Sequence, residues 1–401
     1  MNVVVAQSGG PTAVINASLL GVYRAARQWA EVETVYGSLN GIEGILNDNL
    51  VDLNALLNTE EQQALLRQTP SAALRSCRYK LPTMEKDPAA YERIRATLEA
   101  HDIGTFFYIG GNDSMDTVDK LSAYFASVNS PIRVMGVPKT IDNDLMLMDH
   151  TPGYGSAAKF VSTCMWEMAR DCTVYELDSV LIVEIMGRDT GWLTAAAALP
   201  RLHGCDAPHL VYLPEVDFSA DQFIADVRRV QETTRTVIVA VSEGVELDGL
   251  DEFQSGKVDN FGHKYLSGIG KCLEELVRDR IGCKVRSVEL NILQRCAAHV
   301  ASATDLAEAE QLGAVSVKAA EAGETGRVSA IVSRGDGVYT PEYGTVPVCD
   351  VANKIKYVPR EWIHESGNDV LPAALDYIQP LIQGEPAILT ENGLMRHFII
   401  K

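Results

Sequence analysis

Two aspartates separated by one residue, Asp142 and Asp144, stand in the segment PKTIDND together with Lys139 and Thr140. One carboxylate could accept a proton from a hydroxyl nucleophile as a general base, and the other could hold Mg²⁺ on a polyphosphate. Lys139 could place a positive charge on a phosphate. A solvated acidic turn is the alternative. It is less attractive because these side chains cluster directly after a predicted strand, where ligands bind in α/β sheets.

Two glycine-rich loops also follow predicted strands. In residues 8–10 (SGG), backbone N–H groups could approach an anion at the next helix N-terminus, although a plain turn explains the glycines equally well. In residues 110–114 (GGNDS), Asn112 and Asp113 offer oxygens to Mg²⁺, and Ser114 could be a helix N-cap. For this loop alone, helix capping is the simpler interpretation. No GxxxxGK[ST] motif occurs, which argues against a P-loop protein.

A fourth loop, MGR at residues 186–188, follows an apolar run that carries Glu184. Arginine suits bidentate recognition of phosphate, so Arg188 is a candidate phosphate ligand. An ion pair between Arg188 and Glu184 is the structural alternative. Glu243 ends the strand-like run TVIVAVSE and could accept hydrogen bonds from sugar hydroxyls.

The elements that must position these loops are short β-branched runs alternating with longer helical patterns. Such alternation predicts parallel sheets covered on both faces, that is, a doubly wound α/β fold. Strands are expected at 2–6, 105–109, 132–137, 180–185, 209–213, 236–241 and 328–332. Helices are expected at 15–29, about 114–125, after Gly155, and near 219–232, 265–280 and 304–322.

The composition narrows the class of protein. Of 401 residues, 46% are hydrophobic and 22% charged, and the net charge is −19. A surface this acidic repels nucleic acid and anionic membranes, so we expect small-molecule substrates and no nucleic-acid or membrane partner. No run approaches the ~20 apolar residues of a membrane span, and the N-terminus has no signal-peptide pattern. The 8 cysteines form no CxxC pair, which suits reduced thiols in a cytoplasmic protein.

Taken together, SGG, GGxxS, TIDND and MGR occur in an order and spacing that resemble the phosphofructokinase family over most of the chain. The resemblance implies two doubly wound, three-layer Rossmann-like lobes with the active site between them. It implies a donor-binding lobe of residues 1–154 plus about 294–345. The sugar-phosphate lobe would be residues 155–293 plus about 346–401.

The resemblance also implies roles on the donor side of the site. Gly10 would lie against the donor phosphates, and Arg78, in SCRYK, would steady the transferring phosphoryl group. Asp142 would deprotonate the 1-hydroxyl of the sugar, with Thr140 beside it. Asp144 would act on the metal side, with Mg²⁺ as the cofactor.

On the acceptor side, the resemblance assigns six contacts with the sugar phosphate: Met186, Gly187, Arg188, Glu243, Arg286 and Arg295. Arg286 would reach in from a neighbouring subunit, which implies a homodimer or a homotetramer.

Two departures from the family pattern bear on the donor. ATP-using members typically read GGDGS and PGTIDND, whereas this chain has Asp113 and Lys139 at the glycine positions. Both replacements resemble the pyrophosphate-dependent branch. An aspartate at 113 would occupy space needed by a nucleotide and repel its α-phosphate, and a lysine at 139 would supply charge to pyrophosphate. We therefore place both residues, with Ser114, in the donor site.

Three further positions differ from the family pattern: Asn112 replaces a metal-associated aspartate, Ser179 an arginine, and Ile292 a histidine or tyrosine. The expected reaction is Mg²⁺-dependent phosphoryl transfer from pyrophosphate to fructose 6-phosphate. Open alternatives are an ATP-dependent 6-phosphofructokinase, the same chemistry on sedoheptulose 7-phosphate, and a non-catalytic regulatory subunit that binds sugar phosphates. A distant diacylglycerol- or NAD-kinase-like enzyme would share a GGDG-type loop but not TIDND and MGR.

Overall fold

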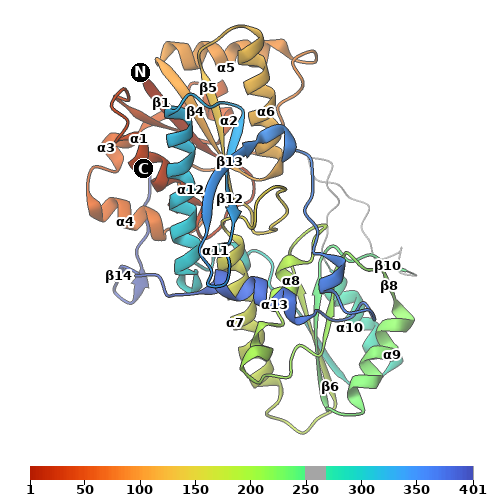
Figure 1. The fold of residues 1–401 in the computed structure, drawn as a ribbon. Coiled ribbons are helices and arrows are strands. Elements are labelled where there is room, and N and C mark those ends of the chain that lie inside the picture. The colour runs from red at the N-terminus through yellow and green to blue at the C-terminus, as the bar shows by residue number, and fades with distance from the viewer. Residues whose placement is uncertain (249–267, 401) are drawn as a thin grey trace. The chain divides into compact units, whose positions relative to one another are not determined.

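The computed structural model describes residues 1–248 and 268–400 (Figure 1). The chain divides into two compact units, and each is assembled from separate stretches of sequence. Unit 1 consists of Met1–Ser156, Arg295–Ile355 and Gly384–Lys401, and unit 2 of Ala157–Gln294 and Lys356–Gln383.

The sequence analysis expected residues from about 346 onward in the second lobe. Lys356–Gln383 lies in unit 2, but the C-terminal tail Gly384–Lys401 belongs to unit 1. Phe398 and Ile400 pack against an apolar core of unit 1. The side chain of Gln68 hydrogen-bonds the backbone of Leu389 and Arg396. These contacts join segments more than three hundred residues apart, which local sequence patterns do not reveal.

Unit 1 is built on a seven-stranded sheet with the strand order β13-β12-β5-β4-β1-β2-β3. The five inner strands are parallel, and β3 and β13 are antiparallel at the edges. The strands are β1 Asn2–Gln7, β2 Val35–Ser38, β3 Leu50–Asp52, β4 Ile103–Gly110, β5 Arg133–Pro138, β12 Arg327–Ser333 and β13 Glu342–Pro347. A short hairpin pairs β14 Thr390–Glu391 with β15 Leu394–Met395.

Helices cover both faces of this sheet, so the doubly wound, three-layer prediction is confirmed (Figure 1). Along β1, Val3 and Val5 pack into the core under α1 and α12, while Val4 and Ala6 pack into the core under α5 and α6. The helices are α1 Ile15–Ala26, α2 Ile42–Leu46, α3 Leu53–Leu56, α4 Glu60–Gln68, α5 Pro88–Ala100, α6 Asn112–Ser127 and α12 Ala303–Glu321.

The first helix packs against α12 at backbone distance. A Cβ on Gly21 would lie 1.9 Å from the carbonyl oxygen of Glu310, so any larger side chain would force the two helices apart. The carboxylate of Glu310 in turn pairs with Arg24 at 2.5 Å and Arg67 at 3.1 Å. Two segments from opposite ends of the sequence are thus joined in one layer.

Unit 2 has a parallel four-stranded sheet with the order β11-β6-β9-β7. On one face, Val180 and Ile182 pack with Phe223 of α9 and Leu273 of α10. The strands are β6 Ser179–Ile185, β7 Leu210–Tyr212, β9 Thr236–Ser242 and β11 Lys284–Glu289, with the short pair β8 Phe218–Ser219 and β10 Leu247–Asp248. The helices include α8 Trp192–Ala196, α9 Ala220–Gln231, α10 Ile269–Arg280 and α13 Pro372–Ile378.

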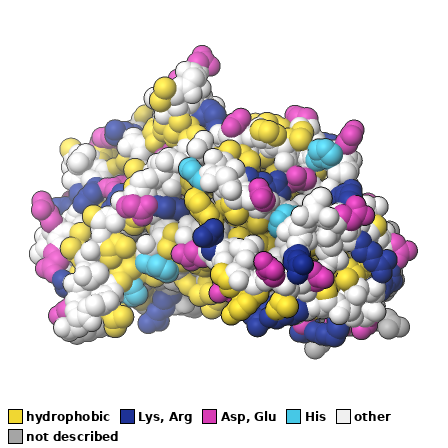
Figure 2. All heavy atoms as spheres, turned by 90° about the horizontal axis from the view of Figure 1, so that it is seen from below, with side chains coloured by type: hydrophobic (Ala, Val, Ile, Leu, Met, Phe, Trp, Pro, Cys, Tyr) yellow, Lys and Arg dark blue, Asp and Glu magenta, His cyan; other side chains and the backbone are white. Residues whose placement is uncertain are grey.

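Two further helices lie where the chain passes between the units, α7 Tyr154–Cys172 and α11 Leu293–Cys296. The expected helix near 265–280 is α10, and positions 265–267 of that expectation lie outside the described residues. In the described part of the chain, no helix is both long and apolar enough to cross a bilayer. Acidic and basic side chains are both scattered over the face shown in Figure 2.

A buried ion-pair cluster in unit 1 follows the TIDND segment along the chain. His150 is 1% exposed, with Nδ1 2.8 Å from Asp149 and Nε2 2.7 Å from Glu308. Arg334 donates to Asp149 from two nitrogens, and the Tyr339 hydroxyl donates to Glu308. Burial alone would lower the pKa of His150, but its hydrogen bonds with the two carboxylates raise the pKa above its ordinary value.

We expect His150→Gln to destabilise the protein most at low pH. Removing one partner of a buried ion pair costs about 3–5 kcal/mol. Because the folded-state pKa of His150 is raised, its stabilising charge is fully present below the unfolded value of roughly 6.5 and is lost as the pH rises through the folded value. Thermal unfolding between pH 6 and 9 should show that the difference in Tm between His150→Gln and the wild type becomes smaller as the pH rises.

His209→Gln in unit 2 is a control whose effect on stability should depend on pH in the opposite direction. Nδ1 of His209 accepts a hydrogen bond from Ile238 at 2.9 Å, and burial and the nearby Arg201 lower the pKa of His209. Its contribution is therefore present above the unfolded pKa and is lost as the pH falls through the lower folded value. If the His150→Gln gap stays constant or widens toward high pH, the assignment of a buried cation is wrong.

Candidate functional site

The glycine pair after β1 lies between two cationic side chains. Gly9 has a φ of +74°, a left-handed conformation that favours glycine. The ammonium of Lys139 donates to the carbonyl oxygen of Gly10 at 2.6 Å, although Lys139 is only 2% exposed. Nη1 of Arg295 lies 3.3 Å from the position that a Cβ on Gly10 would take. The SGG loop therefore offers backbone groups and two nearby positive charges to an anion. Arg295, expected to contact the sugar phosphate, thus lies beside the loop expected to hold the donor.

Sheet topology brings the other candidate loops to the same edge. In the order β5-β4-β1, the strands are parallel, so the loops SGG, GGNDS and PKTIDND all leave their carboxyl ends side by side. The backbone N–H of Lys139 donates to the carbonyl of Gly110 at 3.0 Å, which ties two of these loops together. The structure thus groups these three loops as the strand pattern predicts, and their role in binding the donor stays a prediction.

The TIDND loop is fixed by its own polar groups. The side-chain oxygen of Asn143, which is fully buried, accepts a hydrogen bond from Thr151 N at 3.1 Å. The hydroxyl oxygen of Thr140 accepts one from Asp142 N at 3.1 Å. Asp142 and Asp144 are both more exposed than the asparagine between them. The loop can therefore present two carboxylates while its centre stays anchored.

The head of α6 differs from the expectation. Its N-cap residue is Gly111, without a side-chain cap, and Ser114 is a buried residue inside the first turn, so the predicted N-cap is wrong. The oxygen of Asn112 accepts from Asn353 N, and its amide nitrogen donates to Lys354 O, both at 2.6 Å. An aspartate could not donate the second bond, which explains an amide at this position.

Two basic residues lie on the irregular segment between α4 and α5. Lys80 pairs with Asp113 at 3.6 Å, and both side chains are about half exposed. Arg78, two residues earlier, is exposed. The pairing holds Asp113, the acid expected to exclude a nucleotide, next to the segment that carries Arg78.

In unit 2, the MGR loop and Glu243 follow the adjacent strands β6 and β9. Oε1 of Glu243 accepts hydrogen bonds from the backbone N–H groups of Gly187 and Arg188, each at 3.2 Å. Arg188 itself is exposed, and Met186 is half-buried. Glu243 therefore shapes the MGR loop, and its predicted contact with sugar hydroxyls stays a prediction.

Glu184 has a different partner from the one considered in the sequence analysis. Its carboxylate accepts from Gly268 N at 3.0 Å and Gly270 N at 2.8 Å, at the start of α10. Burial raises the pKa of Glu184, and these two hydrogen bonds oppose the rise. In the described part of the chain, Glu184 forms no ion pair with Arg188, so that structural alternative is wrong.

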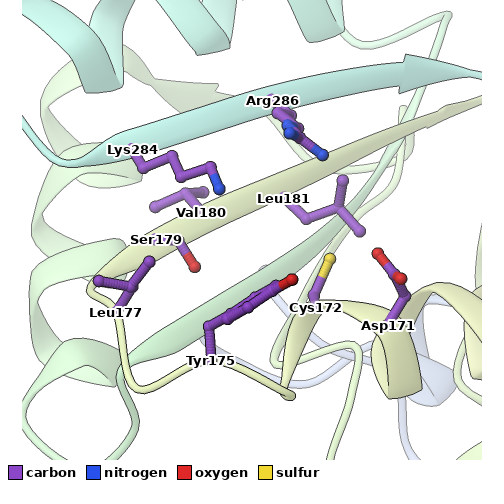
Figure 3. Close-up of a pocket in the computed structure, with 9 residues that line it drawn as sticks. All are labelled: Asp171, Cys172, Tyr175, Leu177, Ser179, Val180, Leu181, Lys284 and Arg286. Atoms are coloured by element: carbon purple, nitrogen blue, oxygen red, sulfur yellow. The ribbon is translucent and has the colours of Figure 1, made fainter.

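Arg286 lies at the other end of the same sheet. On β11 it is in register with Leu181 of β6, and Gly187 follows Leu181 by six residues, roughly 20 Å of extended chain. Arg286 and Lys284 line a pocket of about 360 Å³. Figure 3 shows the side chains around it. The other residues around this pocket are Asp171, Cys172, Tyr175, Leu177, Ser179, Val180 and Leu181. Within one chain, Arg286 does not join the MGR loop.

Residues 2–320 match the family model described as phosphofructokinase. The chain belongs to the phosphofructokinase family. A pyrophosphate–fructose 6-phosphate 1-phosphotransferase from Halomonas elongata is 40% identical over 98% of this chain and 94% of its own length. One from Xanthomonas campestris is 39% identical over 100% of this chain and 96% of its own.

Solved structures of the family share the fold. A pyrophosphate-dependent phosphofructokinase from Marinobacter aquaeolei superposes with a TM-score of 0.85 at 34% identity, covering 100% of this chain and 97% of the other. In sequence alone, an ATP-dependent 6-phosphofructokinase from Corynebacterium efficiens is 29% identical over 90% of this chain and 97% of its own length. The prediction of the family and of its α/β fold is thus confirmed.

Sequence reasoning missed the residues that join the site loops to distant segments, namely Gln7, Asn16, Ser76 and Lys80. Some of them could have been suspected from the sequence. Residues 69–87 carry no helix or strand pattern, and so long an irregular segment needs hydrogen bonds from other parts of the chain to hold it in place.

We expect Glu243→Ala to loosen the MGR loop. Its carboxylate receives two backbone hydrogen bonds, and the loss of a bond to a charged group should speed amide exchange at Gly187 and Arg188 by at least about tenfold. Hydrogen-exchange mass spectrometry measures this. Glu243→Gln, which keeps the accepting oxygen, is the matched control and should exchange nearly as slowly as wild type. Unchanged exchange in the alanine variant would refute the anchoring role.

Proposed function

We propose that the protein transfers a phosphoryl group from pyrophosphate to the 1-hydroxyl of fructose 6-phosphate, giving fructose 1,6-bisphosphate and phosphate. The observation that carries this is the buried ammonium of Lys139 on Gly10, with Arg295 beside it, at the strand edge that also presents Asp142. Relatives 39–40% identical over nearly the whole chain, named as pyrophosphate–fructose 6-phosphate 1-phosphotransferases, support the donor and the acceptor.

In this mechanism, Asp142 accepts the proton of the sugar 1-hydroxyl while the oxygen of that hydroxyl attacks one phosphorus of pyrophosphate. The bond from that phosphorus to the bridging oxygen breaks, and the bridging oxygen leaves with the phosphate. Lys139 and Arg78 neutralise the charge on the moving group, and Thr140 holds the Asp142 backbone in place. Positioning and charge neutralisation supply most of the catalysis in such transfers.

Mg²⁺, when bound, would neutralise pyrophosphate oxygens. In residues 1–248 and 268–400, no group of three or more His, Cys, Asp or Glu side chains could hold a metal. Mg²⁺ usually binds through one or two carboxylates, water and substrate phosphates. Asp144 is the residue that would hold it. Asn112 would contribute only the remaining lone pair of an oxygen already bonded to Asn353.

The choice of donor follows from two side chains. Lys139 provides a fixed cation next to Gly10, where a glycine would leave none. Asp113, paired with Lys80, adds a negative charge at the head of α6 that a longer polyphosphate with a nucleoside would meet. Pyrophosphate needs only the phosphate pocket, so these residues favour it over ATP.

We propose that Arg286 contacts the sugar phosphate bound by a neighbouring subunit. Its distance along the sheet from the MGR loop means that a contact with the sugar 6-phosphate requires a second copy of the chain, as a homodimer or homotetramer. We place the enzyme in the cytoplasm, where its eight free cysteines would remain reduced.

Donor and acceptor assays test the proposal directly. With Mg²⁺ and fructose 6-phosphate, pyrophosphate should support turnover and ATP should support little. We expect the transfer to run near equilibrium, so the reverse reaction from fructose 1,6-bisphosphate and phosphate should also be measurable. Sedoheptulose 7-phosphate serves as the competing acceptor. Turnover with ATP alone would overturn the donor assignment.

Asp142→Ser should lower kcat by about 10²–10⁴-fold with little change in KM, because a general base acts in the transition state. Asp102→Ser is the control, since the Asp102 side chain is 81% exposed on unit 1. Steady-state kinetics with both substrates separates the two constants. Full activity of Asp142→Ser would remove this residue from the chemistry.

The double variant Asp113→Gly, Lys139→Gly should raise the KM for pyrophosphate by about tenfold or more, since each charge-assisted phosphate contact is worth about 1.5–3 kcal/mol. It could also admit ATP, which competition with an ATP analogue would detect. Lys80→Ala, which leaves both positions intact, is the comparison. Unaltered pyrophosphate kinetics in the double variant would refute the argument about the donor.

A further inference from the structure

The segment that carries Arg78 has no regular structure of its own. Residues 69–87 run between α4 and α5 without helix or strand. Ser71 and Arg75 have φ angles of +69° and +61°, a left-handed conformation unfavourable for these residue types. Such conformations persist only when surrounding contacts enforce them, and long irregular segments in compact domains commonly serve a site.

The contacts that enforce this path come from one fully buried amide. Nδ2 of Asn16 donates to Thr69 O and Ser71 O, both at 2.8 Å. Its Oδ1 accepts from Ala73 N at 3.0 Å and from the side chain of Gln7 at 2.8 Å. Both donors and both acceptor positions of the amide are therefore used, three of them on the segment.

Neighbouring side chains extend the same attachment to the SGG loop. Oε1 of Gln7, the last residue of β1, accepts from Leu74 N at 2.9 Å. The Ser76 hydroxyl donates to Gly9 O at 2.8 Å. The segment is thus fastened at several points to the end of β1 and the start of α1, immediately before Arg78.

We propose that Asn16 is a positioning residue for phosphoryl transfer, which acts by fixing the backbone path that delivers Arg78 to the SGG loop. This rests on the role of Arg78 under the proposed function. Asn16 itself is buried and does not touch substrate. Its effect on turnover should therefore pass through Arg78.

A double-mutant cycle tests this with Asn16→Ala, Arg78→Ala and the combined variant, assayed with saturating pyrophosphate and fructose 6-phosphate. A misplacement of about 1 Å can cost on the order of 10²-fold in rate, so Asn16→Ala alone should lower kcat by about 10–100-fold. In the Arg78→Ala background it should add less than about twofold, because the side chain it positions is gone.

Asn368→Ala is the matched control. Asn368 is a similarly buried asparagine, 4% exposed, in unit 2, where its oxygen accepts from Ser366. Its effect on kcat should be equal with and without Arg78. If Asn16→Ala lowers kcat by the same factor with and without Arg78, the effects of the two substitutions multiply. The role of Asn16 is then only structural, and the inference is wrong.

Hydrogen exchange on the wild-type enzyme supplies a measurement that does not depend on a variant folding. The amides of Ala73 and Leu74 should exchange as slowly as those of β1, although they lie in an irregular segment. Fast exchange would overturn the anchoring. If Arg78→Ala retains wild-type kcat while these amides exchange slowly, the role of Arg78 under the proposed function fails, and the anchoring stands without a catalytic consequence.

Discussion

The hydrogen bond from the buried ammonium of Lys139 to the carbonyl of Gly10 sets the geometry on which the rest of the site depends. A buried cation is tolerated only when its partners are held firmly, since desolvation costs several kcal/mol per ion. The end of β5 must therefore lie next to the loop after β1, which the parallel order β5-β4-β1 provides. The same order places the TIDND loop at the same edge of the sheet, so one constraint positions both the cation and the two proposed catalytic carboxylates.

The acidic surface and the basic site act over different distances. A net charge of −19 opposes the approach of any phosphate ester. Salt screens exposed charges beyond a Debye length of about 8 Å at physiological ionic strength. Lys139 and Arg295 both lie close to the glycine pair, and Lys139 is buried, so their attraction acts at short range, where salt screens it little. The acidic exterior then favours solubility without weakening the pocket.

Local patterns predicted seven strands of the two main sheets and the loops that follow them, because a strand such as β4 is apolar in sequence and is followed at once by its glycines. They missed β2 and β3, which are only four and three residues long, and β11 and β13, which are partly exposed. They also predicted that the loop with Lys139 and Asp142 lies at a sheet edge where ligands bind, because it follows a predicted strand. Interactions between distant segments were beyond reach: nothing near Asn112 announces Lys354, and nothing in the last eighteen residues announces Gln68. Such contacts form only because the folded backbone brings distant segments together. In the sequence, the asparagine and glutamine side chains that make them cannot be told from other amides.

The close packing of Gly21 beneath Glu310 has a consequence for how the chain is made. A ribosome adds about 5–20 residues per second, so α12 emerges on the order of 15–60 s after α1. During that interval the face of α1 that carries Gly21 lacks the helix that later covers it, and the nascent sheet lacks the strand β12 that borders β5. The layer that contains α1 and α12 can therefore be completed only after more than three quarters of the chain has been made.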